Sequence, residues 1–558
     1  MRERRPPSRR ASRSAAFALA AFLGWLVGYP LLMTLLQALG LAGGDGWSLA
    51  PFQEFVSRPD EWLALWRSLW ISLASVALAA AIGIPLGFIF ERTEFPGRQF
   101  LGALIALPVA LPPLVGVIAF LFLYGESGFI SRGIRMLFSL DGPPWRLNGP
   151  GAILLVHAYS MYVYFYLFTR AGLARLDNAL LEAAASLGAG PGRTLRKVTL
   201  PLLGPSLAGA ALLTFMTSLA SFSAPYIFGG GFRVMTTQIV FSKLNGETTM
   251  AYVETVTLAA MALVALWAMQ RLSPPAAVEG AVRGIAPSRR QLRSRWSRAL
   301  AGGAGYALAA LMLLPHATLV LISLVPPGTW TTEAWPPVLN FDNYRLLAAE
   351  PGRLTPVWNS LWMATVAALA AVLLGFLAAR SSLRHKGRLG RLLEGLLSLP
   401  WAIPGTVFAV ALATTFSVQQ PWFGRFVLIG TPWILPLAYL VRNLPMTGRA
   451  ALAGLGQLDG ALEEAAASLG ASPWRTARRI VLPLVRPALA AGASLAFITG
   501  LGDFVTSIVL YTYSTRPISI EILSNLRLQE LGVAGVYGVL LMIAGTTAFV
   551  LWGRKEAA

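Results

Sequence analysis

The chain of 558 residues contains no cysteine and only three histidines and four lysines. Because cysteine is absent, a disulfide framework, a thiolate metal site and a cysteine nucleophile are excluded. The histidines, His157, His316 and His385, are scattered, so no histidine cluster indicates a metal site. No lysine follows a glycine, which excludes the Gly-Lys-Ser/Thr phosphate-binding loop of an ATPase.

Charged residues are also scarce. They make up 13% of the chain, against about 25% in ordinary soluble domains, whereas hydrophobic residues make up 56%. Several apolar runs are long enough to cross a hydrocarbon core about 30 Å thick at about 1.5 Å per helical residue. We therefore expect an integral membrane protein whose spans are helices, because an unclosed strand in lipid leaves backbone groups unpaired.

The apolar runs predict about twelve spans, with edges uncertain by several residues. They lie near residues 15–37, 64–90, 99–124, 150–172, 204–228, 250–272, 299–325, 356–380, 391–418, 428–448, 487–511 and 533–553. We expect the first span to be retained, because its apolar run is longer than a typical signal-peptide core.

Arginines predict the orientation. They crowd the first fourteen residues and the segment between the sixth and seventh spans, so both regions are expected in the cytoplasm. The acidic loops 38–63 and 326–355 are then expected outside. Most of the net charge of +20 comes from arginines that flank the spans and set their orientation. A nucleic-acid partner is therefore not expected.

The chain repeats itself. Glu-Ala-Ala-Ala-Ser-Leu-Gly-Ala begins at Glu182 and again at Glu464, and Leu107-Pro108 matches Leu399-Pro400. The spacing between copies shortens by ten residues before the fourth span, where an external loop tolerates insertion. Six spans per half give a parallel repeat about an axis along the membrane normal. The predicted domains are a basic arm 1–14, a first half 15–272 with loop 173–203, a linker 273–298, and a second half 299–558 with loop 449–486.

Each repeated loop predicts a helix, a sharp glycine turn and a second, basic helix. Asp177 and Asp459 are expected to cap the first helices, and Gly188 and Gly470 to end them. The second helices begin at Pro191 and Pro473, and we expect Pro201 and Pro483 to end them at the membrane surface. An amphipathic connector lying on lipid headgroups is the alternative, although lipid contact does not require an identical octapeptide.

Here the chain resembles the permease subunits of ATP-binding-cassette (ABC) importers that are served by a binding protein. Their cytoplasmic signature has Glu-Ala-Ala, then a Gly six residues after the Glu and the Pro of Leu-Pro, and it occurs here twice. The resemblance implies the type I importer permease fold, with a coupling helix in each loop that docks on an ATPase. The coupling residues that it implies are Glu182, Ala183, Ala184, Gly188, Arg193, Pro201, Glu464, Ala465, Ala466, Gly470, Arg475 and Pro483.

The resemblance also implies the partners and the location. Two copies of a separate ABC ATPase would bind ATP and Mg, this chain would hold no cofactor and catalyse no reaction, and a periplasmic or extracellular solute-binding protein would deliver the solute. The chain would be a multi-pass protein of a bacterial inner membrane with a cytoplasmic N-terminus. Closure of the ATPases would rock the two halves between outward-open and inward-open states.

Few residues are candidates for the solute path. Asp503 lies inside a predicted span, where an ionised carboxylate is costly unless it faces protein or water. Its repeat equivalent is Ser221, and we expect Ser221, Phe222, Asp503 and Phe504 to face the central interface. Alternatively, Asp503 pairs with an arginine or caps a broken helix. Arg233 and Arg516 lie in equivalent external segments and could meet acidic residues of a binding protein or an anionic solute, or could simply be solvated.

The solute is less well defined than the family. Residues 221–238 and 506–519 look similar to the ferric-iron members of the importer group, which predicts ferric iron, but thiamine, phosphonate and polyamine importers share the architecture. The alternative from another class is an ion-coupled secondary transporter. It would need coupling groups within the membrane, and we identify little there beyond Asp503.

Overall fold

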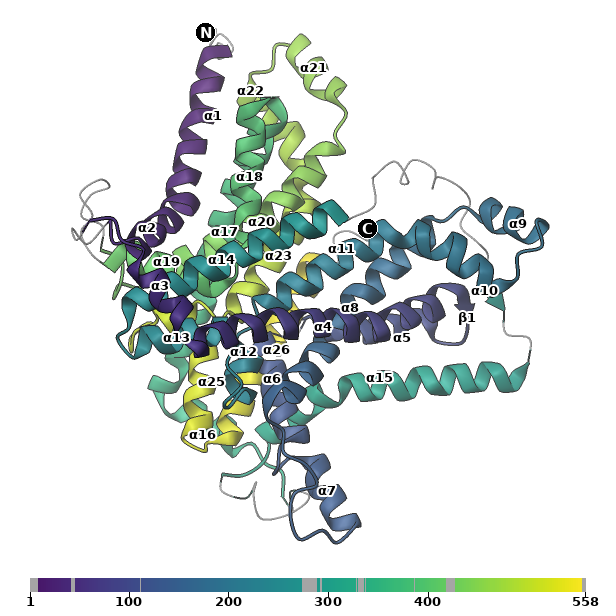
Figure 1. The fold of residues 1–558 in the computed structure, drawn as a ribbon. Helices are drawn as coiled ribbons and strands as arrows, with labels where there is room; N and C mark the ends of the chain where they lie inside the picture. The colour runs from purple at the N-terminus through teal and green to yellow at the C-terminus, as the bar shows by residue number, and fades with distance from the viewer. Residues whose placement is uncertain are drawn as a thin grey trace.

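The computed structural model describes residues 9–41, 46–110, 112–272, 289–291, 294–327, 329, 336, 338–385, 387–417 and 427–553. Nearly all of them lie in helices, which confirms the all-α prediction (Figure 1). Within these ranges the only strands are β1 (Thr93–Glu94) and β2 (Arg290–Gln291), which pair in parallel. Most of the predicted arm 1–14 and linker 273–298 lies outside the described residues.

The first half follows the predicted order of spans. Its helices are α1 (Arg9–Leu23), the π-helix η1 (Gly24–Gly28), α2 (Tyr29–Ala38), α3 (Ala50–Ser57), α4 (Pro59–Arg92), α5 (Arg98–Ala106), the 3-10 helix η2 (Leu107–Ala110), α6 (Pro113–Tyr124), α7 (Phe129–Leu137), α8 (Gly149–Arg175), α9 (Asn178–Ser186), α10 (Pro191–Thr194), the π-helix η3 (Leu195–Thr199), α11 (Leu200–Leu219), α12 (Ser223–Phe228), α13 (Met235–Leu244) and α14 (Thr248–Leu272). The additional residues of this half form α7, just before the fourth span, where the repeat spacing predicts them.

The second half repeats this order. Its helices are α15 (Arg295–Ser323), α16 (Asp342–Ala349), α17 (Pro351–Arg384), α18 (Arg388–Ala402), α19 (Gly405–Ser417), α20 (Ile434–Gly456), α21 (Gly460–Ser468), α22 (Pro473–Thr476), the π-helix η5 (Ala477–Val481), α23 (Leu482–Leu501), α24 (Ser507–Leu510), α25 (Ile518–Arg527) and α26 (Leu531–Gly553). The equivalent helices α4 and α17 are both 34 residues long and both begin at a proline, whose missing N–H costs nothing in a first turn.

Every predicted span contains a helix. Ten helices among the described residues are long and apolar enough to cross a membrane, and the α18–α19 pair makes eleven if it is one span. The helix α20 is outside this set, but it occupies the same place in the second half as α8 does in the first. The prediction of about twelve spans in two six-helix repeats therefore describes the architecture.

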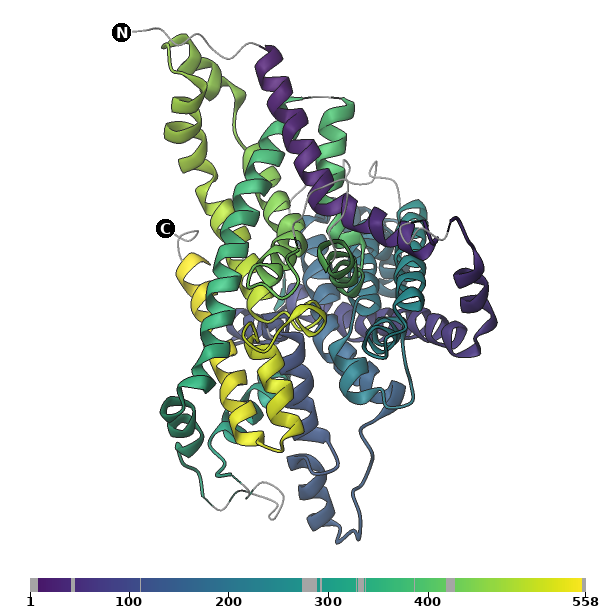
Figure 2. The same cartoon turned by 90° about the vertical axis from the view of Figure 1, so that its left-hand side faces the viewer.

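The first helix of each half packs on the other half. α1 contacts α17 and α18, α2 contacts α19, and α15 contacts α5 and α6. Figure 1 shows α1 beside α18 and α15 beside α5, and Figure 2 shows the purple N-terminal helix beside the green helices of the second half. Polar contacts also join the halves, because the Tyr159 hydroxyl donates to the Met312 carbonyl oxygen at 2.7 Å and Arg527 Nη2 donates to the Tyr226 hydroxyl at 2.5 Å. The halves are thus interlocked rather than simply adjacent.

Two equivalent spans are broken at prolines. The third span changes to the 3-10 helix η2 at Leu107 and resumes as α6 at Pro113. Its equivalent bends by 108° between α18 and α19, at Ile403 and Pro404. A proline inside a helix removes a backbone donor and crowds the preceding turn, which accounts for a break at the same place in both halves.

The prediction that Pro201 and Pro483 end the basic helices is wrong. The helices run on without a break from Pro191 to Leu219 and from Pro473 to Leu501. Just before each proline the helix widens to π geometry, and the Leu200 N–H bonds the Leu195 carbonyl oxygen five residues back. The wider turn accommodates a residue that has no N–H of its own. Each loop is therefore joined directly to a membrane helix.

Two equivalent glycines lie at close helix crossings. Gly83 in α4 faces α8, where an added Cβ would overlap the Tyr162 carbonyl oxygen, and a Cβ on Gly375 in α17 would lie 2.8 Å from Thr447 Oγ1 of α20. Small residues at membrane helix interfaces let backbones approach closely.

We expect Gly83→Ala and Gly375→Ala each to lower the thermal unfolding midpoint in detergent, because overpacking costs about 1–3 kcal/mol. Gly116→Ala is the matched control, because no neighbouring atom lies within 4 Å of an added Cβ there. A Gly83→Ala protein with the midpoint of the unsubstituted chain would contradict the crossing geometry.

Candidate functional site

The two repeated loops begin with the same cap. Asp177 Oδ1 accepts a hydrogen bond from the Ala179 N–H at 3.0 Å, and Asp459 Oδ1 accepts one from the Ala461 N–H at 3.0 Å. These bonds satisfy a backbone donor at the start of α9 and of α21, as the sequence predicts.

The turns that follow are equally alike. Gly188 has φ of +75° and Gly470 has φ of +74°, a left-handed conformation that favours glycine. Ser472 then caps α22 by accepting a hydrogen bond from the Arg475 N–H at 3.3 Å, whereas its equivalent Gly190 has no side chain to do so. The two loops thus share one backbone shape with small differences in side-chain support.

Ten of the twelve predicted coupling residues are exposed, while Ala184 and Ala466 are buried within their loops. The most exposed apolar side chains of the two loops are Leu187, which is 87% exposed, and Leu469, which is 88% exposed. Each precedes the turn glycine of its loop. Figure 1 shows the loops, α9–α10 and α21–α22, at the tips of separate arms. Each loop therefore presents an apolar side chain that this chain itself does not cover.

The loops differ in how they are held. In the second loop, Glu463 forms ion pairs with Arg380 at 3.2 Å and Arg384 at 2.7 Å, near the end of α17. The first loop has Leu181 at that position. There, Glu182 accepts a hydrogen bond from Asn178 at 2.6 Å instead.

The second predicted site lies where α11 and α23 end. α11 ends at Leu219 and α23 at the equivalent Leu501, and the chain then breaks before α12 and α24. Just after these breaks the Phe222 and Phe504 rings lie 5.5 Å apart, and both are buried. The structure thus brings two of the four predicted path residues together, one from each half.

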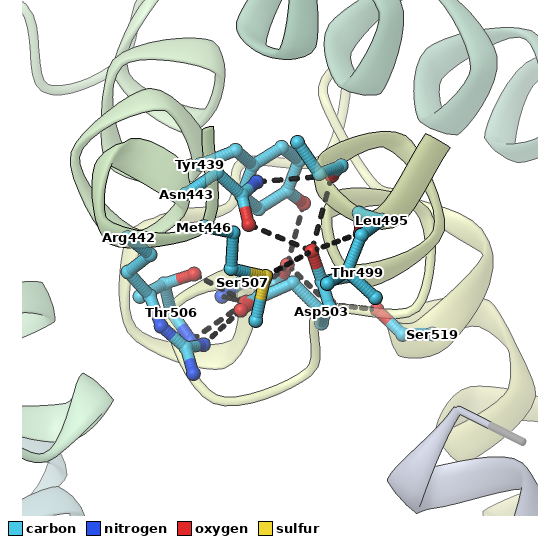
Figure 3. Close-up of polar contacts among 11 residues, drawn as sticks. Tyr439, Arg442, Asn443, Met446, Leu495, Thr499, Asp503, Thr506, Ser507 and Ser519 are labelled. Carbon is cyan, nitrogen blue, oxygen red and sulfur yellow. Dashed lines mark hydrogen bonds and ion pairs between the residues drawn. The ribbon is translucent and has the colours of Figure 1, made fainter. Parts of the chain in front are cut away.

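Asp503 lies at the centre of a polar network (Figure 3). Its Oδ2 forms an ion pair with Arg442 of α20. Its Oδ1 accepts hydrogen bonds from the Thr506 N–H at 2.9 Å and the Ser507 N–H at 3.2 Å, and so caps α24. Both alternative roles of Asp503, pairing with an arginine and capping a broken helix, are therefore observed. Contact with a solute stays a prediction.

Arg442 is a residue that the sequence analysis overlooked. It lies inside the predicted span 428–448, and a charged residue within a span is by itself a signal of a functional site. Glu254 lies within another predicted span and is fully buried. The predicted spans therefore contain charged residues besides Asp503, contrary to the prediction.

The equivalent place in the first half is neutral. The Ser221 hydroxyl lies 2.9 Å from Nε2 of the buried His157, whose Nδ1 lies 2.8 Å from the Ser75 hydroxyl. His157 is the repeat equivalent of Tyr439, whose hydroxyl contacts Ser507 at 2.7 Å. Both networks fix the backbone break, but only the second includes a charge pair.

The two predicted external arginines have different surroundings. Arg233 is exposed and its guanidinium lies 4.7 Å from the centre of the Phe241 ring. Arg516 is paired with Glu521 at 2.9 Å and stacks on Tyr513. Contact of either residue with a binding protein stays a prediction. Within the described residues, no group of three or more His, Cys, Asp or Glu side chains could hold a metal ion.

Comparison with known proteins follows the repeat. The family of binding-protein-dependent transport system inner membrane components matches the chain twice, over residues 83–277 and 371–554. A probable ABC transporter permease protein of Sinorhizobium fredii is 30% identical over 547 residues, covering 96% of this chain and 95% of the relative.

Two further relatives carry substrate names. A ferric transport system permease protein of Actinobacillus pleuropneumoniae is 28% identical, covering 86% of this chain and 68% of the relative. A thiamine transport system permease protein of Escherichia coli is 26% identical, covering 86% of this chain and 87% of the relative. A solved bacterial ABC transporter involved in alginate import aligns with a TM-score of 0.38 and 18% identity over 47% of this chain and 98% of that one. The matches in both halves and the full-length relative show that this chain belongs to the binding-protein-dependent transport system inner membrane components, as a fused two-half ABC importer permease.

Proposed function

We propose that this permease carries ferric iron across the membrane. The observation that carries the proposal is the ferric transport relative, which matches 86% of the chain at 28% identity. Residues 221–238 and 506–519, which surround the broken helices, support it by their similarity to ferric importers. In this proposal the iron is a passing cargo, and the external binding protein selects it.

The proposal includes the partners of the two loops. One ABC ATPase subunit docks on α9–α10 and a second copy docks on α21–α22, and each binds ATP and Mg. The matching caps, glycine turns and exposed leucines of the loops support identical partners. Since each loop continues directly into α11 or α23, movement of a docked ATPase is passed to the helices that end at Leu219 and Leu501, just before Phe222 and Phe504.

The orientation belongs to the same proposal. The N-terminus and both loops lie on the cytoplasmic face of a bacterial inner membrane, and the outer loops receive a periplasmic or extracellular solute-binding protein. Arginines at the N-terminus and between the halves support this arrangement.

Uptake by cells tests the cargo. Cells that lack this chain are supplied with the gene or with an empty vector, and uptake of ⁵⁵Fe(III) and of radiolabelled thiamine is measured. We expect the gene to restore iron uptake at least tenfold above the vector and to leave thiamine uptake unchanged. Restored thiamine uptake without iron uptake would replace ferric iron by thiamine as the cargo.

A further inference from the structure

Arg442 places a positive charge within the membrane. It lies in α20 (Ile434–Gly456), about two turns from the helix start, and its side chain is 32% exposed. A guanidinium at this depth is costly if it faces lipid, so such groups face protein or a water-filled cavity. The exposed part of Arg442 is therefore expected to face protein or water rather than lipid.

Only one edge of the guanidinium is occupied. Its Nη1 bonds Asp503, and among the described residues no further hydrogen bond from this guanidinium is observed. Figure 3 shows the other edge turned away from the residues of the network. Since a guanidinium carries five N–H donors, most of its donors are available to a ligand.

Asp503 is fully engaged and does not compete for those donors. Its Oδ1 accepts from the backbone of Thr506 and Ser507, and its side chain is 5% exposed. It holds the guanidinium by one edge and fixes its orientation, which lowers the entropy that a ligand must remove on binding.

Gly405 makes room for this arrangement. A Cβ on Gly405, the first residue of α19, would lie 2.8 Å from Cζ and 3.0 Å from Nε of Arg442. The guanidinium therefore lies against bare backbone at the 108° bend between α18 and α19. The bend, Gly405 and Asp503 together hold the Arg442 guanidinium in this position.

The charge is present in one half only. The repeat equivalent of Arg442 is Ser160, whose hydroxyl donates to the Val156 carbonyl oxygen of its own helix at 2.8 Å. The repeat does not require an arginine at this position, so packing of the shared fold does not account for it.

We propose that Arg442 binds an anionic oxygen group of the cargo, a carboxylate or a phosphate, as the cargo passes between the halves. A guanidinium matches the planar geometry of such groups. This inference rests on the proposed iron transport and deepens it, because a bare ferric ion is repelled by Arg442 whereas a ferric chelate that presents carboxylate or phosphate oxygens is attracted.

Chemical modification of the full chain in lipid nanodiscs tests the site directly. The chain is treated with phenylglyoxal, which modifies guanidinium groups, and modification at each arginine is quantified by peptide mass spectrometry. We expect Arg442 to react, and citrate or inorganic phosphate to slow its reaction several-fold relative to chloride at equal ionic strength. Arg353 is the matched control, because its side chain is 20% exposed and, like that of Arg442, is paired with a carboxylate; its reaction should not be slowed.

The two anions separate the two chemistries. Protection by citrate alone indicates carboxylate ligands, and protection by phosphate alone indicates phosphate ligands. Failure of Arg442 to react with phenylglyoxal would overturn the proposal, because water would then not reach it. A reaction that is as fast in citrate and in phosphate as in chloride would overturn it too.

Uptake by variants provides an independent test. Arg442→Lys keeps the charge, and the pair Arg442→Gln with Asp503→Asn removes both charges without leaving Asp503 unpaired. We expect the double variant to lose about tenfold or more of the ⁵⁵Fe uptake at equal amounts in the membrane, and Arg442→Lys, which keeps the charge but not the planar geometry, to lose less. A double variant that transports normally would overturn the role of Arg442. If the unsubstituted chain carries no iron, ferric transport fails, yet protection of Arg442 by the anions is measured without iron and still stands.

Discussion

Replacing Leu187 and Leu469 with aspartate is expected to detach this chain from its proposed ATPase. Both leucines are almost fully exposed, so the folded chain loses no internal contact when they are changed. A partner that buries one leucine gains about 1.5–3 kcal/mol, and about 1.4 kcal/mol corresponds to a tenfold change in affinity. Each single substitution should therefore weaken ATPase binding about tenfold or more, and the double substitution should abolish co-purification and solute uptake.

Leu244→Asp is the matched control for this experiment. Leu244 is 65% exposed, but it lies at the end of α13, on the side predicted to be external. Its substitution should leave ATPase co-purification unchanged. The two single loop variants should have similar effects because the loops share their backbone shape. If the double variant still retains the ATPase and still transports, the loops are not the coupling elements.

The repeated loops could be predicted closely from the sequence because their signals are local. A capping aspartate, a turn glycine and a proline at a helix start each act within a few residues, and the caps at Asp177 and Asp459 and the turns at Gly188 and Gly470 are as predicted. The error at Pro201 and Pro483 arose from the same local view. A proline usually ends a helix, but the helix here widens into a π turn and continues into the membrane.

The central site could be predicted only in part. Asp503 stood out because a carboxylate is rare in an apolar run, but its partner Arg442 lies 61 residues earlier in the chain, and no local pattern connects them. The contact between Phe222 and Phe504 required the two halves to be aligned first, which the repeat made possible. The interlocking of α1 and α15 with the opposite halves leaves no sequence signal that periodicity or capping rules could detect.

Removing Arg442 alone is expected to destabilise the protein more than removing both members of its ion pair. Asp503 is 5% exposed on its side chain, so Arg442→Met leaves a buried carboxylate without its cation, a change that typically costs about 3–5 kcal/mol. Asp503→Asn should cost less, because the guanidinium is 32% exposed and water can solvate it. Replacing a whole buried pair by uncharged groups of similar size is often close to neutral, so Arg442→Met with Asp503→Asn should recover part of the loss.

The order of thermal unfolding midpoints in detergent checks this expectation, with Arg442→Met lowest, the double variant higher and Asp503→Asn higher than Arg442→Met. The equivalent substitution Ser160→Ala in the first half is the control and should shift the midpoint little, because Ser160 bonds only within its own helix. An Arg442→Met chain as stable as the unsubstituted one would contradict a stabilising role of the Arg442–Asp503 ion pair. Because the paired Asp503 partly neutralises the guanidinium, Arg442 is expected to attract an anionic cargo less strongly than an unpaired arginine would, so that a bound cargo can also depart.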